Sequence, residues 1–350
     1  MFCQVSKFFS DIDNGMYDHP LLWVIPTSSH LSNTINNLAI RRIILLLCGG
    51  VLLICLTGCA GLKKWELLQK AGKLPAGFEI KTVPFFPQKA HQCGPASLAM
   101  ALNWSGVPVS PEDLTDEVFT SSRKGSLQTA LISAARRHGR IAYVSTGMDA
   151  IFSEVAADHP VIILQNLGLS WYPVWHYSVV VGYNIPKKFV ILRSGTTSRK
   201  IMAFRVFEKT WARSHYWGLL ILRPDQLPAM AKKDLFLKGV LGLEKARQFH
   251  AAIHGYKTAL TRWPQNLIAL MGIGNCHYAL GELKDAELAF RETVRLHPRE
   301  GSAFNNLAQI LFEQGRSQEA LEAAKKAVSF GGPLRGVYQK TLEEIQAEKP

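Results

Sequence analysis

The order of hydrophobic and polar positions divides the chain into segments of different kinds. The one long, uninterrupted apolar run lies within 41–59. From 78 to 223 the pattern is mixed, and it predicts an apolar helix after Cys93, a helix near 126–138 and several buried strands. The predicted strands include 161–164, 177–181 and 189–192. After residue 232 every segment has helical spacing, so we expect an α+β domain followed by an all-α region.

The segment 41–59 has the three regions of a secretory signal: two arginines, an apolar run of about 14 residues, and small residues at its end. That run is short for a bilayer span, which needs roughly 20 residues. Its ending, Leu-Thr-Gly-Cys, resembles a bacterial lipobox. The resemblance implies that 1–58 is a cleaved signal peptide and that Cys59 becomes the lipidated first residue of the mature protein. An uncleaved signal-anchor helix is the alternative, and both interpretations place the remainder outside the inner membrane.

The residues around this segment add three expectations. Residues 1–40 are an awkward extension for a signal peptide, and we expect the true start of the protein to lie after them. Ala60 stands where an inner-membrane retention signal would show Asp, so the resemblance favours the outer membrane, facing the periplasm. Residues 59–77 are rich in lysine, and we expect them to be a lipidated tether near the membrane.

The helical region repeats with a period of 34 residues. Residues one period apart include Pro264 and Pro298, Leu270 and Phe304, Ile273 and Leu307, Gly274 and Ala308, Gly281 and Gly315, and Ala286 and Ala320. The pattern resembles tetratricopeptide repeats, in which small residues let two helices approach and a proline ends the second helix. We therefore expect 232–350 to hold repeats at about 233–266, 267–300 and 301–334, followed by a closing helix. By resemblance, such repeats recruit a protein partner or a polypeptide substrate.

Candidate chemistry lies in the mixed domain, which we expect to span 78–225. Gln88, four further residues and then Cys93 precede Gly-Pro at the start of an apolar helix. The positive end of a helix favours a thiolate, so the pKa of Cys93 is expected to be lowered. A thiolate nucleophile also needs a general base and donors for the developing oxyanion. His176, at the start of a predicted strand, is the candidate base, and Gln88 with the Cys93 backbone N–H are the candidate donors.

Two motifs carry a family resemblance. Gln-x₄-Cys-Gly-Pro-Ala-Ser-Leu and the later His-Tyr-x-Val-Val-Val-Gly-Tyr resemble the papain-like cysteine peptidases that process double-glycine leader peptides of bacteriocins, over about 80–223. The resemblance implies a papain-like α+β fold with Cys93 as nucleophile, His176 as general base and acid, and Gln88 as the oxyanion-hole side chain. Lipoproteins that join such a domain to tetratricopeptide repeats form a bacterial family, which the chain also resembles.

One position departs from that family's pattern. In the family, an Asp at the end of the second strand after the His orients the imidazole, and aligning the strands puts Arg193 and Ser194 in its place. An arginine side chain only donates hydrogen bonds, so Arg193 cannot accept one from the His176 Nδ1–H. We expect Ser194, Asn184 or a backbone carbonyl to hold the imidazole more weakly. In related triads the orienting carboxylate contributes about 10⁴ in rate, so the departure predicts weaker proteolysis.

Composition and charge exclude several classes. The chain of 350 residues is 47% hydrophobic and 19% charged, which excludes a disordered chain and a multi-span membrane protein. The formal net charge is +13, but no dense basic run occurs, so we expect no nucleic-acid partner. The positive charge either interacts with an anionic surface of the cell envelope or serves only to keep the protein in solution.

The six cysteines and the absent motifs narrow the chemistry further. There is no Cys-x-x-Cys and no His-Glu-x-x-His, so we expect no metal, and no nucleotide-binding loop, so we expect no cofactor or ATPase. Cys276 is predicted to be a small buried side chain in a helix. Trp171, Tyr172 and Trp175 are expected in a cleft wall or the core, and His159 on the surface or capping a helix.

These observations lead to one leading hypothesis and two alternatives. The leading hypothesis is a lipid-anchored cysteine peptidase of the cell envelope that acts on a peptide or protein substrate through Cys93 and His176. The first alternative is a weakly active or inactive scaffold that binds peptide in the same cleft. The second is an amidase or acyl transferase using the same two residues, because thiolate chemistry does not choose between water and an amine as acceptor.

Overall fold

The computed structural model describes residues 69, 72 and 74–347. Its contacts divide the chain into two units, Met1–Leu67 and Leu68–Pro350. The second unit contains its own hydrophobic core, from Leu74 to Ile345, as independent folding requires. The expected signal peptide, the lipidation at Cys59 and most of the expected tether lie outside the described residues. Among the helices that the structure describes, none has the length and apolar character needed to cross a bilayer.

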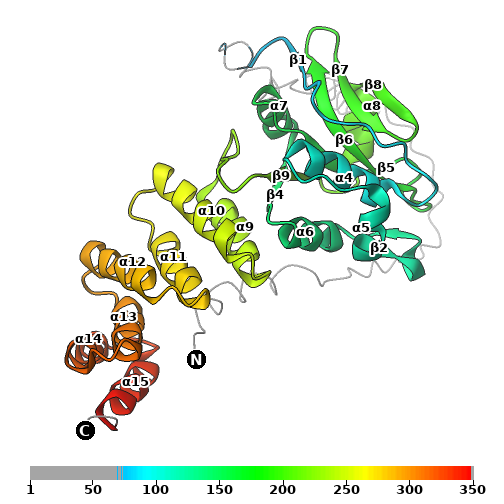
Figure 1. Ribbon diagram of the computed structural model, residues 1–350. Coiled ribbons are helices and arrows are strands. Elements are labelled where there is room, and N and C mark those ends of the chain that lie inside the picture. Colours follow the sequence, from blue (N-terminus) through cyan, green and yellow to red (C-terminus); the bar gives the residue numbers. More distant parts are fainter. Residues whose placement is uncertain (1–68, 70–71, 73, 348–350) are drawn as a thin grey trace, which may run out of the picture. The chain divides into compact units, whose positions relative to one another are not determined.

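The first part of the described unit is built on an antiparallel sheet of seven strands (Figure 1). Along the sheet the order is β4-β9-β5-β6-β7-β8, and β1 pairs with the far half of β6. The strands are β1 (Gly77–Glu79), β4 (Ile141–Thr146), β5 (Val161–Asn166), β6 (Trp175–Asn184), β7 (Phe189–Ser194), β8 (Thr197–Ala203) and β9 (Trp217–Leu222). The central strands are almost continuously buried, as their unbroken apolar runs predict.

Helices cover this sheet, and the small strands β2 (Phe119–Thr120) and β3 (Gly125–Ser126) form a separate pair. The helices are α4 (Cys93–Trp104), α5 (Pro111–Val118), α6 (Gln128–Arg137), α7 (Met148–Ala156) and α8 (Phe204–Ala212). Helix α4 contacts β5, β6 and β9, whereas α8 contacts β5, β7 and β8. Residues 94–102 of α4 are all buried, which explains why its sequence is apolar on every side.

Strand β6 carries His176 at its beginning and Gly182 near its end. A bulge between Val180 and Gly182 lets the Val181 carbonyl accept from the N–H of Ile80, 2.7 Å away. A Cβ atom at Gly182 would lie 2.8 Å from the Phe78 carbonyl oxygen. The glycine of the Val-Gly-Tyr motif is therefore needed for β1 to pair with β6.

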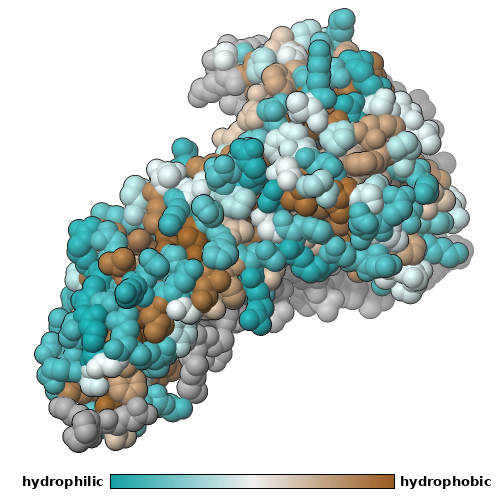
Figure 2. Space-filling view, viewed as in Figure 1, coloured by the Kyte–Doolittle hydropathy of each residue, from teal (hydrophilic) through white to brown (hydrophobic). Residues whose placement is uncertain are grey.

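The second part is all helical, so the expected fold class, an α+β domain followed by tetratricopeptide repeats, is confirmed. Its helices are α9 (Lys233–Lys245), α10 (Phe249–Arg262), α11 (Leu267–Ala279), α12 (Leu283–Leu296), α13 (Gly301–Glu313), α14 (Ser317–Phe330) and α15 (Arg335–Ala347). Successive helices pack as pairs, and α15 packs on α13 and α14. On the face shown in Figure 2 these helices are mostly hydrophilic, with smaller hydrophobic areas between them.

Small residues let paired helices approach as the repeat pattern predicts. A Cβ atom at Gly274 of α11 would lie 2.6 Å from the ring of Phe290 in α12, and Ala286, Ala308 and Ala320 are fully buried. Cys276 is also fully buried, and burial raises the pKa of its thiol, as expected for a packing residue.

The first helical pair rests on the sheet. Helix α9 contacts β4, and a Cβ atom at Gly239 would lie 2.8 Å from Cγ2 of Ile141. The segment before α9 is fixed by Glu154 of α7, a fully buried carboxylate that accepts from the backbone N–H groups of Ala229 and Met230. His159 lies 2.9 Å from the same carboxylate and is buried, so the surface position is wrong; its backbone N–H instead bonds the Glu154 carbonyl at the end of α7, in keeping with the alternative of a helix cap.

Two glycine substitutions test the repeat packing. Gly274→Ala forces a methyl group into the buried Phe290 ring, and we expect it to lower the free energy of unfolding by about 1 to 3 kcal/mol. Gly336→Ala in α15 is the matched control, because nothing lies near its Cβ position and alanine favours a helix by about 0.5 to 1 kcal/mol. Urea unfolding of both variants measures the difference. Equal stability of the two would contradict this packing.

Candidate active site

Cys93 is the first residue of α4, where the sequence predicts it. Its neighbour Gly94 is required there, because a Cβ atom would lie 2.3 Å from the Ser126 hydroxyl of β3. Pro95 falls in the first helical turn, where a missing N–H removes no helical hydrogen bond. The backbone N–H of Tyr177, the residue after His176, lies near enough to the thiol to lower its pKa. The fold therefore brings the start of α4 to the start of β6.

The expected lowering of the Cys93 pKa is wrong for this resting structure. Burial of the thiol raises its pKa, and this effect outweighs the N–H groups of Tyr177, Gly94 and Cys93 itself, which act in the opposite direction. The positive end of α4 favours the thiolate, but desolvation of the thiol, which the local sequence does not reveal, has the larger effect. In the free protein Cys93 is a neutral thiol at neutral pH.

His176 is held by a pair of serines. Its Nε2 lies 2.9 Å from the hydroxyl of Ser194, the last residue of β7. The hydroxyl of Ser178 in turn donates to Ser194 Oγ over 3.0 Å, and both serines are buried. The expectation named Nδ1 as the held nitrogen, whereas Nε2 is held here. Nδ1 is therefore the ring nitrogen left for the thiol or a substrate.

The other residues considered for this position lie elsewhere. Asn184 stands eight positions along β6 from His176, about 26 Å away along an extended strand, and its Oδ1 accepts from the N–H of Lys187. Arg193 donates instead to the carbonyl oxygens of Ser198 and Val83. Successive residues of a strand point to opposite faces, so Ser194 and not Arg193 turns to the imidazole.

Among the residues that the structure describes, no carboxylate forms a hydrogen bond or ion pair with the His176 imidazole. Burial lowers the pKa of His176 to about 4, and the ammonium of Lys200 acts in the same direction. A neutral imidazole beside a neutral thiol is therefore the resting state at neutral pH. The sequence instead predicts a thiolate at Cys93.

Gln88 links three elements around Cys93. Its backbone N–H donates to the Gly195 carbonyl over 3.0 Å, and its side-chain Oε1 accepts from the Gly195 N–H over 2.8 Å. Its Nε2 lies 3.2 Å from both the Ser97 hydroxyl of α4 and the Tyr177 carbonyl of β6. Because the Gly195 N–H can only donate, it fixes which end of the amide is oxygen and directs Nε2 toward α4 and β6.

This arrangement qualifies the expected oxyanion donor. Both hydrogens of the Gln88 amide have acceptors in the resting structure, each at a long distance of 3.2 Å. Long hydrogen bonds of this kind are weak, so a developing oxyanion could take over one of them at modest cost. The structure places the Gln88 amide against the Ser97 hydroxyl and against the carbonyl of Tyr177, the residue after His176, with its donor group engaged by protein.

Sequence reasoning missed two serines at this site. Ser178 shares a face of β6 with His176, and the period of two along a strand was enough to find it. Ser126 touches the Cys93–Gly94 turn, and its buried hydroxyl has no hydrogen-bond partner among the described residues. No sequence signal pointed to Ser126, because the pairing of β2 with β3 positions it, more than 30 residues after Cys93.

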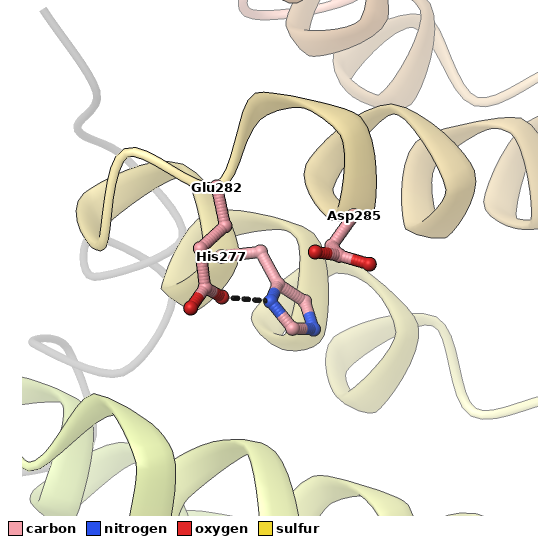
Figure 3. Close-up of side chains that lie close together, drawn as sticks. All are labelled: His277, Glu282 and Asp285. Atoms are coloured by element: carbon pink, nitrogen blue, oxygen red, sulfur yellow. Dashed lines mark hydrogen bonds and ion pairs between the residues drawn. The ribbon is translucent and has the colours of Figure 1, made fainter.

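A separate group of side chains offers metal-ligand atoms within the repeats. His277, Glu282 and Asp285 each present one such atom within 4.8 Å of the others (Figure 3). His277 Nδ1 already lies 2.6 Å from Glu282, across the turn between α11 and α12. The Glu282 N–H also donates to the His277 carbonyl. These two hydrogen bonds stabilise the turn between the helices, and they explain why the three side chains lie together.

The low pKa of His176 predicts a pH dependence of stability. An unfolded histidine titrates near 6.5 and the folded one near 4, so the unfolded chain binds more protons between these values. Stability is then complete above about pH 6.5 and falls toward pH 4, by up to about 3 kcal/mol. We expect His176→Gln to lose less stability than the unchanged chain over this range in urea unfolding. The same loss in both would contradict the burial of a neutral imidazole.

Comparisons with known proteins agree with this architecture. Residues 80–218 match the model of the Peptidase_C39 like family, and residues 237–299 and 284–333 match a tetratricopeptide repeat model. No curated protein matches the chain.

Solved structures of both kinds are similar to parts of the chain. A C39-like protein from Bacillus anthracis is 19% identical, with a TM-score of 0.37, over 42% of this chain and 98% of that one. The double glycine motif protease of an AMS/PCAT transporter, solved with the leader peptide, is 23% identical, with a TM-score of 0.32, over 41% and 93%. The Yersinia enterocolitica secretion chaperone SycD, with a peptide of the translocator YopD, is 15% identical, with a TM-score of 0.32, over 33% and 94%. From the two family models, the chain carries a C39-like peptidase domain followed by tetratricopeptide repeats.

Proposed function

We propose that the chain is a cysteine peptidase in which Cys93 attacks the peptide carbonyl and His176 moves the proton. The observation that carries this proposal is the meeting of Cys93, at the start of α4, with the start of β6, where Ser194 holds His176. The C39-like family match over these residues supports it. A cysteine that served only for packing would not need a histidine held by Ser194 nearby.

The neutral resting pair determines how the reaction begins. As the Cys93 sulfur bonds to the carbonyl carbon, its proton passes to Nδ1 of His176, which acts as general base. The imidazolium then gives that proton to the departing amine as the C–N bond breaks. Water, deprotonated by the same imidazole, hydrolyses the thioester and restores the thiol. Ser194 keeps Nε2 engaged throughout, so Nδ1 stays directed at the reaction.

The oxyanion formed in both steps needs donors close to Cys93. The Cys93 backbone N–H and Gln88 Nε2 are the proposed pair, and Gln88 would exchange a weak 3.2 Å contact for a charge-assisted hydrogen bond. Donors that are already positioned cost little reorganisation when the charge develops. The two hydrogen bonds between Gln88 and Gly195 supply this positioning.

We also propose where the reaction takes place and how substrate arrives. Acylation of Cys59 would anchor the mature chain in the cell envelope, at the outer membrane facing the periplasm. The helical repeats would recruit a protein partner or the polypeptide substrate, in keeping with their family match. No cofactor takes part in this scheme.

The neutral pair also favours a second candidate. A thiol with a raised pKa and an imidazole with a pKa of about 4 suit a domain that binds peptide without cleaving it. Amide or acyl transfer by the same two residues is the remaining alternative, because an amine could replace water at the thioester. Analysis of the products separates hydrolysis from transfer.

Replacement of the nucleophile tests the peptidase directly. We expect Cys93→Ala to abolish peptide hydrolysis and labelling by thiol-directed peptidase probes, while the thermal unfolding midpoint stays close to that of the unchanged chain. Cys276→Ala is the matched control, because that thiol is fully buried in the repeats and should not contribute to labelling. Equal labelling of Cys93→Ala and the unchanged chain would refute the proposal.

Ser194 offers a second test of the mechanism. Ser194→Asp places a carboxylate beside His176, which raises the imidazole pKa and favours the thiolate, so alkylation of Cys93 at neutral pH should rise about tenfold or more. Ser194→Ala should lower turnover by about 3- to 10-fold, the range for losing one neutral hydrogen bond. Ser198→Ala, an exposed change in the same hairpin, is the control. Unchanged pH dependence of alkylation in Ser194→Asp would show that Ser194 does not hold the catalytic imidazole.

A further inference from the structure

An exposed aromatic hairpin projects from the end of the sheet that carries His176. Residues 167–175 join β5 to β6, and we call them the aromatic hairpin. Trp171 is 81% exposed, Tyr172 69% and Trp175 49%, so the expected place in the core is wrong for all three. Other exposed apolar side chains of this hairpin are Leu167, Leu169 and Val174. Gathering so many large apolar side chains in one exposed turn indicates a binding surface.

The hairpin is a built structure and not a loose loop. The buried side chain of Asn166 accepts from the N–H groups of Gly168 and Val174, over 3.0 and 2.9 Å. A Cβ atom at Gly168 would lie 2.4 Å from the Tyr172 carbonyl oxygen, so the turn needs this glycine. Arg213 donates to the carbonyl oxygens of Asn166 and Gly168. The hairpin therefore holds its aromatic side chains in position before binding, which lowers the conformational entropy lost on binding.

Basic residues lie beside the hairpin, and charge is absent from it. No Asp, Glu, Lys or Arg occurs between residues 159 and 186. Arg205, Lys209 and Arg213 follow one another at intervals of four residues along α8 and its C-terminal cap, so they share one side of that helix. We call these three residues the basic ridge. Because Arg213 contacts the base of the hairpin, the basic ridge runs up to it.

We propose that the aromatic hairpin and the basic ridge together bind the surface of an anionic phospholipid bilayer. Tryptophan and tyrosine favour the boundary between headgroups and acyl chains, where their rings are apolar and their N–H and O–H groups stay hydrated. Each lysine or arginine near an anionic leaflet adds about 1 kcal/mol, or about fivefold in affinity. An uncharged tip flanked by cations matches this chemistry.

The shape of the surface favours a bilayer over a peptide as its occupant. Peptide and small-ligand subsites are concave and bury most of what they bind. Trp171 and Tyr172 instead stand at the tip of a hairpin, with most of their surface exposed. A projecting tip can enter the headgroup layer of a membrane, and it cannot enclose a side chain.

The aromatic hairpin lies directly beside His176 in the sequence, so membrane binding would place the candidate active site near the bilayer. Trp175 is the last residue before His176 and the first of β6. A bilayer that receives the hairpin therefore lies close to the candidate active site, and it orients that site toward polypeptides at the membrane surface. The inference needs neither peptidase activity nor acylation of Cys59.

Vesicle binding by the unit Leu68–Pro350 tests the inference, because this unit has its own core and lacks both the apolar leader and Cys59. Co-sedimentation is measured with mixed phosphatidylcholine and phosphatidylglycerol vesicles and with pure phosphatidylcholine vesicles. The double variant Trp171→Ala, Tyr172→Ala should weaken binding to mixed vesicles by about tenfold or more. Leu288→Ala is the matched control, a 66% exposed apolar residue of α12, and it should bind as the unchanged unit does.

The basic ridge is tested in the same assay. Arg205→Gln with Lys209→Gln should weaken binding to mixed vesicles by about 25-fold, and added salt should weaken it in the unchanged unit. Lys257→Gln with Arg262→Gln, two exposed cations of α10, is the matched control. Binding that is equal on both kinds of vesicle, or unaffected by the hairpin variant, overturns the proposal. A hairpin variant that instead raises KM for a peptide, or dissociates a dimer, while vesicle binding is unchanged would assign the surface to substrate or to a second copy.

Discussion

The candidate site depends on the pairing between Gln88 and the turn that joins β7 to β8. Two hydrogen bonds between Gln88 and Gly195 tie the segment before α4 to this turn. The residue before Gly195 is Ser194, which holds the imidazole of His176. One contact therefore sets the place of the proposed oxyanion donor and of the base. A shift of one residue in β7 would replace the Ser194 hydroxyl with the Arg193 guanidinium, which cannot accept a hydrogen bond from the imidazole Nε2–H.

Within the described part of the chain the imidazole of His176 is held by a hydroxyl and not by a carboxylate, which shapes the chemistry of this site. Burying an ion pair costs several kcal/mol per ion unless other groups solvate it, and here the imidazole contacts the Ser194 hydroxyl, which itself accepts from Ser178. Keeping Cys93 and His176 neutral avoids that cost in the resting protein. The proton then moves only when a carbonyl is present to accept the sulfur. Such a site is less reactive toward other electrophiles than a preformed thiolate would be.

Local patterns in the sequence were sufficient for the fold class and for the residues nearest the chemistry. The period of 34 residues and the Cys-Gly-Pro start of an apolar helix both depend on neighbouring positions, and the structure shows the corresponding elements. Properties set by distant contacts could not be predicted in this way. The raised pKa of Cys93 follows from burial, and the buried pair of Glu154 and His159 depends on how α7 meets the segment before α9. The exposure of Trp171 likewise depends on where the sheet ends.

The pH dependence of Cys93 alkylation tests most directly whether the thiol and the imidazole are neutral at rest. In the unit Leu68–Pro350 the remaining thiol, Cys276, is fully buried, so iodoacetamide reports on Cys93. We expect the alkylation rate to be low at neutral pH and to rise only above the ordinary cysteine pKa of about 8.5. A rate that is already high and level near pH 5 to 6, roughly the range in which thiolate and imidazolium coexist, would contradict it.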